Sequence, residues 1–420
     1  MTTPSAKNLF ESYDRMGFFC EMFGAGPRPP FHTELVRRRL EALGLSELRA
    51  RAGAAERELY NLGITFAVVS ETESLDRILP FDIIPRLLSP EDWRTIETGL
   101  VQRVRALNLF IHDIYHDQKI LKDGVVPADL VLGNPGYRPE MRGVDLAFGT
   151  YIHICGIDIV RDEIGRFLVL EDNARTPSGV SYVVENRLLM QRTFSDLLVN
   201  IGVRPVTEYG PRLHAALCKV APRTADPHIV LLSPGVYNSA YFEHVFLARE
   251  MGVPLVEGPD LMVEDDRVYM KTATGLAPVD VIYRRVNDDY LDPDVFQADS
   301  VVGVAGLMRA YRRGNVALAN AIGTGVADDK AVYYYVPRII RYYLGEDPIL
   351  PNVETYLCRE KRDLAFTLDH LADLVVKPVG ESGGYGVVVG PRATVAEIAE
   401  CRAKILARPE SFISQPMINI

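Results

Sequence analysis

The chain has 420 residues, of which 48% are hydrophobic and 24% are charged, and its formal net charge is −10 at pH 7. This length exceeds that of one ordinary core and predicts about two or three globular domains. The acidic balance argues against a general nucleic-acid binder, which needs a basic surface to neutralise phosphates. The sequence shows no signal-peptide pattern and no apolar run of membrane-spanning length, and its five scattered cysteines are typical of reduced thiols. We therefore expect a cytoplasmic protein.

The first part of the chain is predicted to be mostly helical. Leucines recur through residues 33–63 at the spacing of a buried helical stripe. Apolar residues recur at three- and four-residue steps through residues 95–117, which predicts a second, strongly amphipathic helix. A strand is predicted between them at residues 64–70. We assign residues 1–125 to an N-terminal, mostly helical region.

A hairpin is predicted in the next region. Strands at residues 151–160 and 166–172 are separated by RDEIG, which has a glycine at the turn. A helix at residues 186–202 follows, and Gly202 is its predicted stop. We group residues 126–222 as a domain part built around this hairpin.

Acidic and amide side chains gather at the end of the hairpin. If the two arginines that flank the turn lie roughly opposite each other, Asp158 lies opposite about Val169 and Glu171 lies one pair further on. Because side chains alternate across a strand, Asp158, Glu171 and Asn173 then share one face, and Asp172 points the other way. Their oxygens are ligands that Mg²⁺ prefers, so we predict a magnesium site. Solvated acids at a strand end are the alternative, and this pattern alone leaves both interpretations open.

The third region alternates strand and helix. A strand at residues 228–235, a helix at residues 239–252 and a strand at residues 253–258 indicate a βαβ unit with a parallel strand pair. A further strand is predicted at residues 279–286. We assign residues 223–300 to a separate α/β domain.

The last region, residues 301–420, contains a glycine-rich loop between two predicted strands. Lys377 stands at the end of the first strand, where its ammonium group could meet a phosphate. Glycines let backbone N–H groups approach phosphates closely, and the loop places them at Gly380, Gly383, Gly384 and Gly386. The pattern is neither a Walker sequence nor a glycine motif that opens a helix, and a plain glycine hairpin is the alternative.

Lys330 is a second lysine that could contact a nucleotide. It precedes residues 331–336, AVYYYV, which we predict to be a strand. The alternative for such an isolated lysine is an ordinary surface position.

Taken together, these motifs resemble the ATP-grasp superfamily and, more narrowly, its circularly permuted members related to glutathionylspermidine synthase. The resemblance rests on Asp158, on Glu171-x-Asn173, on a distant lysine and on the loop KPVGESGGYG, and it extends to the phrases EDNARTPSGVSYVVENR and VIYRRVNDDYLDP. In ordinary ATP-grasp enzymes the nucleotide lysines and the glycine loop precede the metal residues, whereas here they follow them. The resemblance covers the chain from about residue 60 to its end. It implies an α/β fold with α+β lobes, namely a circularly permuted ATP-grasp fold with a pre-ATP-grasp-like α/β domain.

The resemblance also implies roles for individual residues. By position, the expected magnesium ligands are Asp158, Glu171 and Asn173; the expected nucleotide lysines are Lys330 and Lys377; the glycines between 380 and 386 would cover the phosphates; and Gln415 and Met417 would lie at the adenine-binding hinge. The related synthetase has an arginine two residues before its first metal aspartate, and that position is Gly156 here. We name Arg175 and Arg285 as candidates for the phosphoryl or carboxylate contact. Arg284 lies on the opposite face of the same strand, so only one of Arg284 and Arg285 is expected to reach the site, and a surface salt bridge is the alternative for the other.

The chemistry implied by the resemblance is ligation. ATP phosphorylates a carboxylate, and an amine attacks the acyl phosphate to give an amide, ADP and phosphate. We predict an ATP- and Mg²⁺-dependent ligase that joins a small-molecule or peptide carboxylate to an amine, with no nucleic-acid or membrane partner. A non-catalytic nucleotide-sensing or partner-binding module and a phosphotransferase that forms no amide are the alternatives. The resemblance implies further strands after the hinge, whereas this chain ends at Ile420. Two explanations are open here: the sequence is a shortened form, or the native chain is itself short. The sequence names neither substrate and no oligomeric state.

Overall fold

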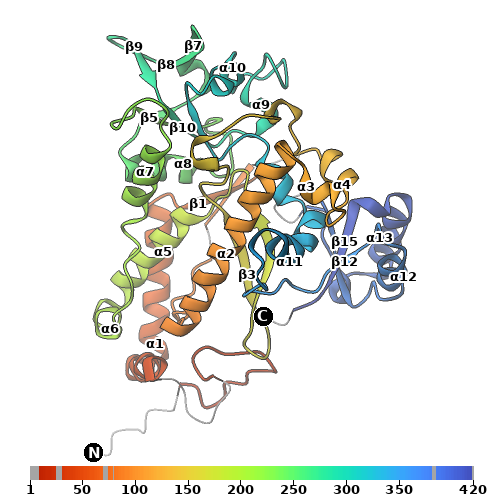
Figure 1. The fold of residues 1–420 in the computed structure, drawn as a ribbon. Helices are drawn as coiled ribbons and strands as arrows, with labels where there is room; N and C mark the ends of the chain where they lie inside the picture. The colour runs from red at the N-terminus through yellow and green to blue at the C-terminus, as the bar shows by residue number, and fades with distance from the viewer. Residues whose placement is uncertain (1–8, 25–30, 70–73, 79, 381–384, 419–420) are drawn as a thin grey trace, which may run out of the picture. The chain divides into compact units, whose positions relative to one another are not determined.

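The computed structural model describes residues 9–24, 31–69, 74–78, 80–380 and 385–418. The chain folds into two compact units, each made of two segments. The first unit comprises Met1–Pro90 and Ser178–Ala317, and the second comprises Glu91–Pro177 and Leu318–Ile420. The chain is a mixed α/β protein, as predicted (Figure 1). The four domain segments named from the sequence remain predictions, and the two units have other boundaries, after residues 90, 177 and 317.

Helices form one part of the first unit. α1 (Phe31–Asn61) contacts α5 (Val180–Thr193) and α6 (Ser195–Ile201), and Leu40 and Leu48 of the predicted leucine stripe are buried in the core there. The helix predicted at residues 186–202 is in fact two helices, because Phe194 has non-helical angles of −137° and 55°. Gly202 ends the second helix in the left-handed conformation, as expected for a stop.

A parallel sheet forms the other part of the first unit. β5 (Ile229–Leu232) pairs in parallel with β6 (Leu255–Val256) across α8 (Tyr241–Met251), which confirms the predicted βαβ unit. β10 (Val281–Arg284) pairs in parallel with the other side of β5. Every residue of β5 and β10 is buried, as expected where both faces of a parallel sheet are covered. The sheet order is β11-β10-β5-β6, and the chain passes from the first unit to the second within β11 (Ala317–Ala319).

Smaller elements complete the first unit. They are β1 (Thr65–Val69), β2 (Ser74–Ile78), α7 (Tyr209–Lys219), β7 (Leu261–Glu264), β8 (Arg267–Thr272), β9 (Gly275–Val279), α9 (Asp288–Leu291) and α10 (Leu307–Arg312). β1 and β2 form an antiparallel hairpin, and β7, β8 and β9 form an antiparallel sheet.

The second unit is built around the predicted hairpin. β3 (Gly156–Arg161) and β4 (Phe167–Asn173) are antiparallel, and β3 begins five residues later than predicted. One face of the hairpin packs through Val169 against Leu100 of α2 (Pro90–Tyr115) and Tyr333 of α11 (Lys330–Leu344). Two short helices, α3 (Lys119–Lys122) and α4 (Ala128–Leu132), follow α2. The opposite face of the hairpin is the one that carries the predicted metal ligands.

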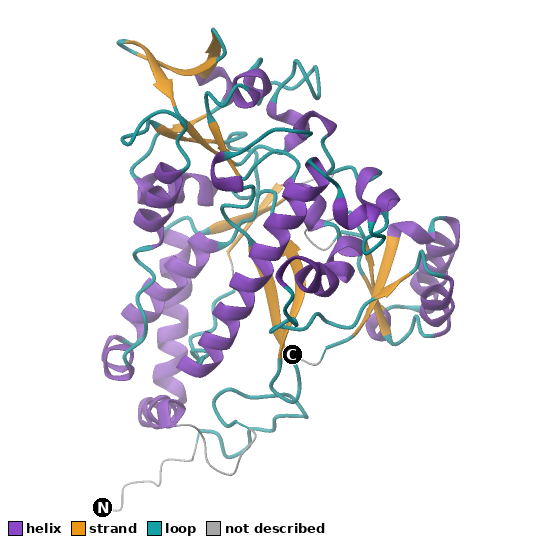
Figure 2. Cartoon of the chain, in the orientation of Figure 1, coloured by secondary structure: helices purple, strands orange, loops and turns teal. Residues whose placement is uncertain are grey.

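A small antiparallel sheet lies in the C-terminal part of the second unit. Its strand order is β12-β15-β13-β14, and the strands are β12 (Tyr356–Leu357), β13 (Leu374–Pro378), β14 (Val388–Val389) and β15 (Phe412–Pro416). α12 (Lys361–Asp369) and α13 (Val395–Ala407) lie beside this sheet (Figure 2). α13 opens with a capping box, in which Thr394 and Glu397 accept hydrogen bonds from each other's backbone N–H groups.

The strand predicted at residues 331–336 is wrong, because these residues lie in α11. Asp329 caps this helix by accepting hydrogen bonds from the backbone N–H groups of Ala331 and Val332. The β-branched and aromatic residues that favour a strand instead bury one helical stripe, which includes Val332, Val336 and Ile339. Lys330 is therefore the first residue of a capped helix.

Candidate active site

The two predicted metal carboxylates are cross-strand partners. Asp158 on β3 lies directly opposite Glu171 on β4, and Asn173 lies opposite Gly156. Because paired residues project to the same side, Asp158, Glu171 and Asn173 share one face of the hairpin. Burial, the negative charge of Glu171 and side-chain hydrogen bonding with it together raise the pKa of Asp158. Two acids this close are stabilised by a shared proton or by a cation.

The register that brings these acids together differs from the predicted one. Asp158 was expected opposite Val169, but Val169 pairs with Ile159. A β-bulge falls between these two pairs and leaves Leu170 as the extra residue. Without the bulge, Asp158 would pair with Leu170 and Ile157 with Glu171. Glu171 would then project from the face opposite to that of Asp158. The predicted shared face is present because the bulge compensates for the error in the predicted turn.

Both predicted nucleotide lysines lie at these carboxylates. The Nζ atom of Lys330 is 3.5 Å from Oε2 of Glu171, and the backbone N–H of Lys330 donates to the carbonyl of Val379 just after β13. Lys377 on β13 interacts electrostatically with Glu171, Asp158 and Lys330. Burial lowers the pKa of Lys377, and the charge of Glu171 opposes this shift. The hairpin and the glycine-loop strand, about 200 residues apart in sequence, therefore meet in one place.

The glycine loop connects β13 to β14. Gly380 is described and exposed, whereas Gly383 and Gly384 lie outside the described residues. Gly386 has a φ of +70°, and a Cβ atom there would lie 2.9 Å from Cγ of Pro378. The returning part of the loop therefore lies against the end of β13, and only glycine fits its conformation without strain.

The predicted adenine hinge follows the neighbouring strand. Gln415 on β15 pairs with Val375, two residues before Lys377. Its buried Nε2 atom donates to Oγ1 of Thr355 at 3.0 Å, and Oε1 has no hydrogen-bond partner among the described residues. Met417, just beyond β15, is partly exposed. The hinge residues thus continue the same sheet that carries Lys377.

The two candidate arginines lie in different units. Arg175 follows β4 in the second unit, where Asp328 accepts a hydrogen bond from its backbone N–H and lies 3.8 Å from its Nε atom. Arg285 lies in the first unit, buried, with a terminal nitrogen 3.4 Å from Oε1 of Glu243. Neither role is tested by this geometry, and both stay predictions. Arg284 forms a fully buried ion pair with Asp288, so the surface salt bridge named as the alternative is not found at this residue.

The structure explains why position 156 is a glycine. A Cβ atom on Gly156 would lie 2.9 Å from Cβ of Pro177. An arginine at this position would need Pro177 to move, because Pro177 occupies the space into which its side chain would extend.

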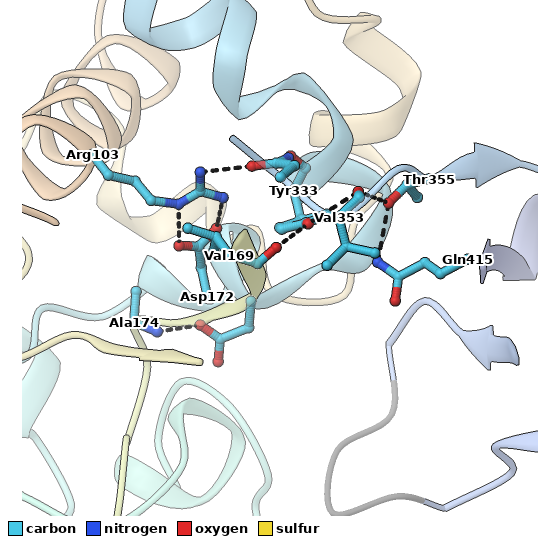
Figure 3. Close-up of polar contacts among 10 residues, drawn as sticks. Arg103, Val169, Asp172, Ala174, Tyr333, Val353, Thr355 and Gln415 are labelled. Carbon is cyan, nitrogen blue, oxygen red and sulfur yellow. Dashed lines mark hydrogen bonds and ion pairs between the residues drawn. The ribbon is translucent and has the colours of Figure 1, made fainter. Parts of the chain in front are cut away.

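The reverse face of β4 contains a buried ion pair that the sequence did not indicate. Asp172 points away from the carboxylates, as predicted, and accepts two parallel hydrogen bonds from Arg103 of α2, each 2.6 Å long (Figure 3). Both side chains are at most 1% exposed. Arg103 is one of several arginines on an amphipathic helix, so only its tertiary position identifies it. Asp328, which accepts a hydrogen bond from the backbone N–H of Ala174, was also missed.

These residues suit a magnesium ion bound together with a nucleotide. Mg²⁺ usually takes one or two protein carboxylates and completes its shell with water and substrate phosphates. Asp158 and Glu171 supply two such carboxylates, and Lys330 and Lys377 can neutralise the phosphates. No group of three or more His, Cys, Asp or Glu side chains among the described residues is arranged to hold a metal ion alone. Within that same part of the chain, no helix combines the length and apolar character needed to cross a bilayer.

Comparison with known proteins identifies the family. The family model described as "a circularly permuted ATPgrasp" matches residues 85–415. The chain belongs to the circularly permuted ATP-grasp family. The predicted family and fold are thereby confirmed, and the order of the β3–β4 hairpin and the glycine loop along the chain agrees with the permutation.

Several relatives share most of this ATP-grasp chain. An uncharacterized protein from Synechocystis sp. is 48% identical over 98% of this chain and 85% of its own length. An uncharacterized protein from Mycobacterium tuberculosis is 49% identical over 96% of this chain and 72% of its own length. A Frankia casuarinae protein named "Putative glutamate--cysteine ligase 2-2" is 42% identical over 99% of this chain, which spans about half (48%) of that relative.

A solved structure shares the fold. A glutathione synthetase-like effector (GSS30) from Globodera pallida superposes with a TM-score of 0.53 over 88% of this chain and 80% of its own, at 10% sequence identity. At this identity the likeness concerns the fold alone.

Proposed function

We propose that this chain is an ATP- and Mg²⁺-dependent ligase that joins a carboxylate to an amine through an acyl phosphate. Membership in the ATP-grasp family, together with the name of the Frankia relative, supports a carbon–nitrogen ligase without specifying its substrates. The finer proposal is a reaction like that of glutathionylspermidine synthase, on a small-molecule or peptide carboxylate, in the cytoplasm. The name of the Frankia relative supports amino-acid substrates, although that relative is about twice as long as this chain.

The observation that carries this proposal is the convergence of two carboxylates and two lysines. Lys330 and Lys377 come from different elements, and both interact with Glu171. The cluster brings two ammonium groups and two carboxylates close together. A bound triphosphate would take up the lysines, and a divalent cation would take up the carboxylates.

Each residue then has a definite task. Asp158, Glu171 and Asn173 would hold Mg²⁺, which when bound screens the charge of the phosphates and stabilises the transferring phosphoryl group. Lys330 and Lys377 bind phosphate oxygens as point charges. The glycines between 380 and 386 would cover the phosphates, with backbone N–H groups as the expected donors. Arg175, the candidate arginine of the same unit, binds the carboxylate that receives the phosphoryl group.

A non-catalytic ATP-binding module is the second candidate. The observation in its favour is Gly156, because Pro177 takes the space of the arginine that the related synthetase has there. Such a module would bind ATP and Mg²⁺ without turning ATP over.

The test measures ADP release from ATP and Mg²⁺ with a panel of carboxylates and amines. We expect release that requires one acid and one amine together, and that Glu171→Ala abolishes. Glu163→Ala is the matched control, because Glu163 is an exposed carboxylate in the turn of the same hairpin. Undiminished release by Glu171→Ala would refute the metal assignment. Nucleotide binding without turnover on any pair would favour the non-catalytic module.

A further inference from the structure

The bulge in β4 lies between two buried anchors. Before the bulge, the carbonyl of Val169 accepts a hydrogen bond of 2.6 Å from the hydroxyl of Tyr333, and its backbone N–H donates to Pro351. After the bulge, Asp172 accepts both hydrogen bonds from Arg103. Val169 and Asp172 are three residues apart yet face the same side, because the extra residue Leu170 shifts the alternation between them.

The two anchors belong to one connected network. The third guanidinium nitrogen of Arg103 donates to Oδ1 of Asn352 at 2.8 Å, and Nδ2 of Asn352 donates to the carbonyl of Tyr333 at 2.9 Å. The guanidinium also lies 5.4 Å from the centre of the Tyr333 ring. Figure 3 shows Arg103 and Tyr333 above the same stretch of β4. The network therefore joins α2 and α11 to both sides of the bulge.

We propose that the Arg103–Asp172 pair, supported by Tyr333, is a positioning device that holds the bulge and thereby keeps Glu171 opposite Asp158. Glu171 and Asn173 are the chain neighbours of Asp172, so fixing the Asp172 side chain on one face fixes the direction of both neighbours on the other. A slip of one residue would turn Glu171 away from Asp158. The proposal rests on the proposed metal site, since it explains how the ligands of that site are aligned.

A purely structural role is the competing explanation. A buried ion pair can often be replaced by apolar residues of similar volume without loss of stability, whereas removal of one partner alone is destabilising. The informative variant is therefore the double substitution Arg103→Met/Asp172→Leu, which removes both charges together. In this variant a structural role predicts unchanged metal binding, and a positioning role predicts weakened metal binding in a folded protein.

The experiment titrates the full chain with Mn²⁺, which serves as a paramagnetic probe for the magnesium site, in the presence of a non-hydrolysable ATP analogue. Free Mn²⁺ is measured by electron paramagnetic resonance. We expect the double variant to raise the Kd for Mn²⁺ about 10- to 100-fold, the range for losing a group that orients metal ligands. Arg284→Met/Asp288→Leu is the matched control, because it removes an equally buried Arg–Asp pair from the other unit. We expect this control to leave the Kd within about twofold of the wild-type value, because neither residue belongs to the hydrogen-bond network that borders the bulge.

A folded double variant that binds Mn²⁺ as tightly as the wild type would overturn the proposal. If the double variant does not fold, Tyr333→Phe decides, since it keeps the ion pair and removes the hydrogen bonds that the Tyr333 hydroxyl donates to the carbonyls of Val169 and Val353. A smaller rise in Kd supports the proposal, and an unchanged Kd overturns it. Glu171→Ala separates this result from the proposed function. Loss of Mn²⁺ binding in Glu171→Ala with normal binding in the double variant overturns only the positioning role. Normal binding in Glu171→Ala overturns the metal site and the positioning role together.

Discussion

Asp329 connects the start of α11 to the lysine cluster, and its replacement gives a prediction that does not depend on the reaction. One of its oxygens, Oδ1, accepts hydrogen bonds from the backbone N–H groups of Ala331 and Val332, at 2.7 and 3.2 Å. The other, Oδ2, accepts a hydrogen bond of 2.9 Å from the amide of Asn134. The residue is only 7% exposed, so water cannot readily replace these bonds in an alanine variant.

The expected cost of Asp329→Ala follows from these contacts. Loss of a helix N-cap costs about 1 kcal/mol. Leaving the half-buried amide of Asn134 without its acceptor costs about 1–2 kcal/mol, the lower part of the range for buried groups. Burial raises the pKa of Asp329, so relief of its desolvation offsets part of this cost. We expect a net loss of about 2 kcal/mol, which is a decrease of about 1 M in the urea midpoint for a slope of about 2 kcal/mol per M.

The assay uses the single tryptophan of the chain. Trp93 lies on α2 in the second unit, the unit that contains Asp329, so its fluorescence reports the unfolding of the relevant part of the protein. Asp329→Asn is the control, because asparagine is also a good N-cap and keeps one acceptor oxygen. A midpoint for Asp329→Ala that equals the wild-type midpoint would refute the reasoning. An equal loss in Asp329→Asn would refute the capping explanation.

Two further predictions concern charge. Lys377→Met should weaken ATP binding about 10- to 150-fold in calorimetry, because it removes a charge-assisted phosphate contact worth about 1.5–3 kcal/mol. Lys361→Met, at an exposed lysine of α12, is the control. Equal affinities of the two variants for ATP would contradict the assignment of Lys377. His244, whose Nδ1 atom is 2.9 Å from Oγ of Ser233, is buried, and burial lowers the pKa of His244 from 6.5 to about 3. Below about pH 6.5 the histidine is protonated in the unfolded chain but stays neutral in the folded one, so the free energy of unfolding decreases as the pH falls toward 3. About 2 kcal/mol of this decrease falls between pH 7 and pH 5. His244→Gln should flatten the decline of the urea midpoint over this range in circular dichroism, and parallel declines in variant and wild type would argue against it.

The sequence alone determined the elements that carry strong local signals. The capping box at Thr394, the βαβ pattern around α8 and the stop at Gly202 depend on contacts between residues close in sequence, and all three are present. The family was also readable from Asp158, Glu171-x-Asn173 and the glycine loop, because those residue types have few other uses in that combination. By contrast, residues 331–336 have the composition of a strand, and the cap at Asp329 together with burial on the hairpin makes them helical.

Only the tertiary structure decided how the carboxylates are aligned. The face on which Glu171 projects depends on one bulged residue, Leu170, and no local pattern marks that position. The bulge is bordered by contacts to Arg103 and Tyr333, which are 69 and 164 residues away from their partners on β4. Contacts at such separations form only when distant segments pack together, and the identities of the contacting residues do not specify which of many possible partners they will meet. The residue types of the candidate site could therefore be identified from the sequence, whereas their geometry required the folded chain.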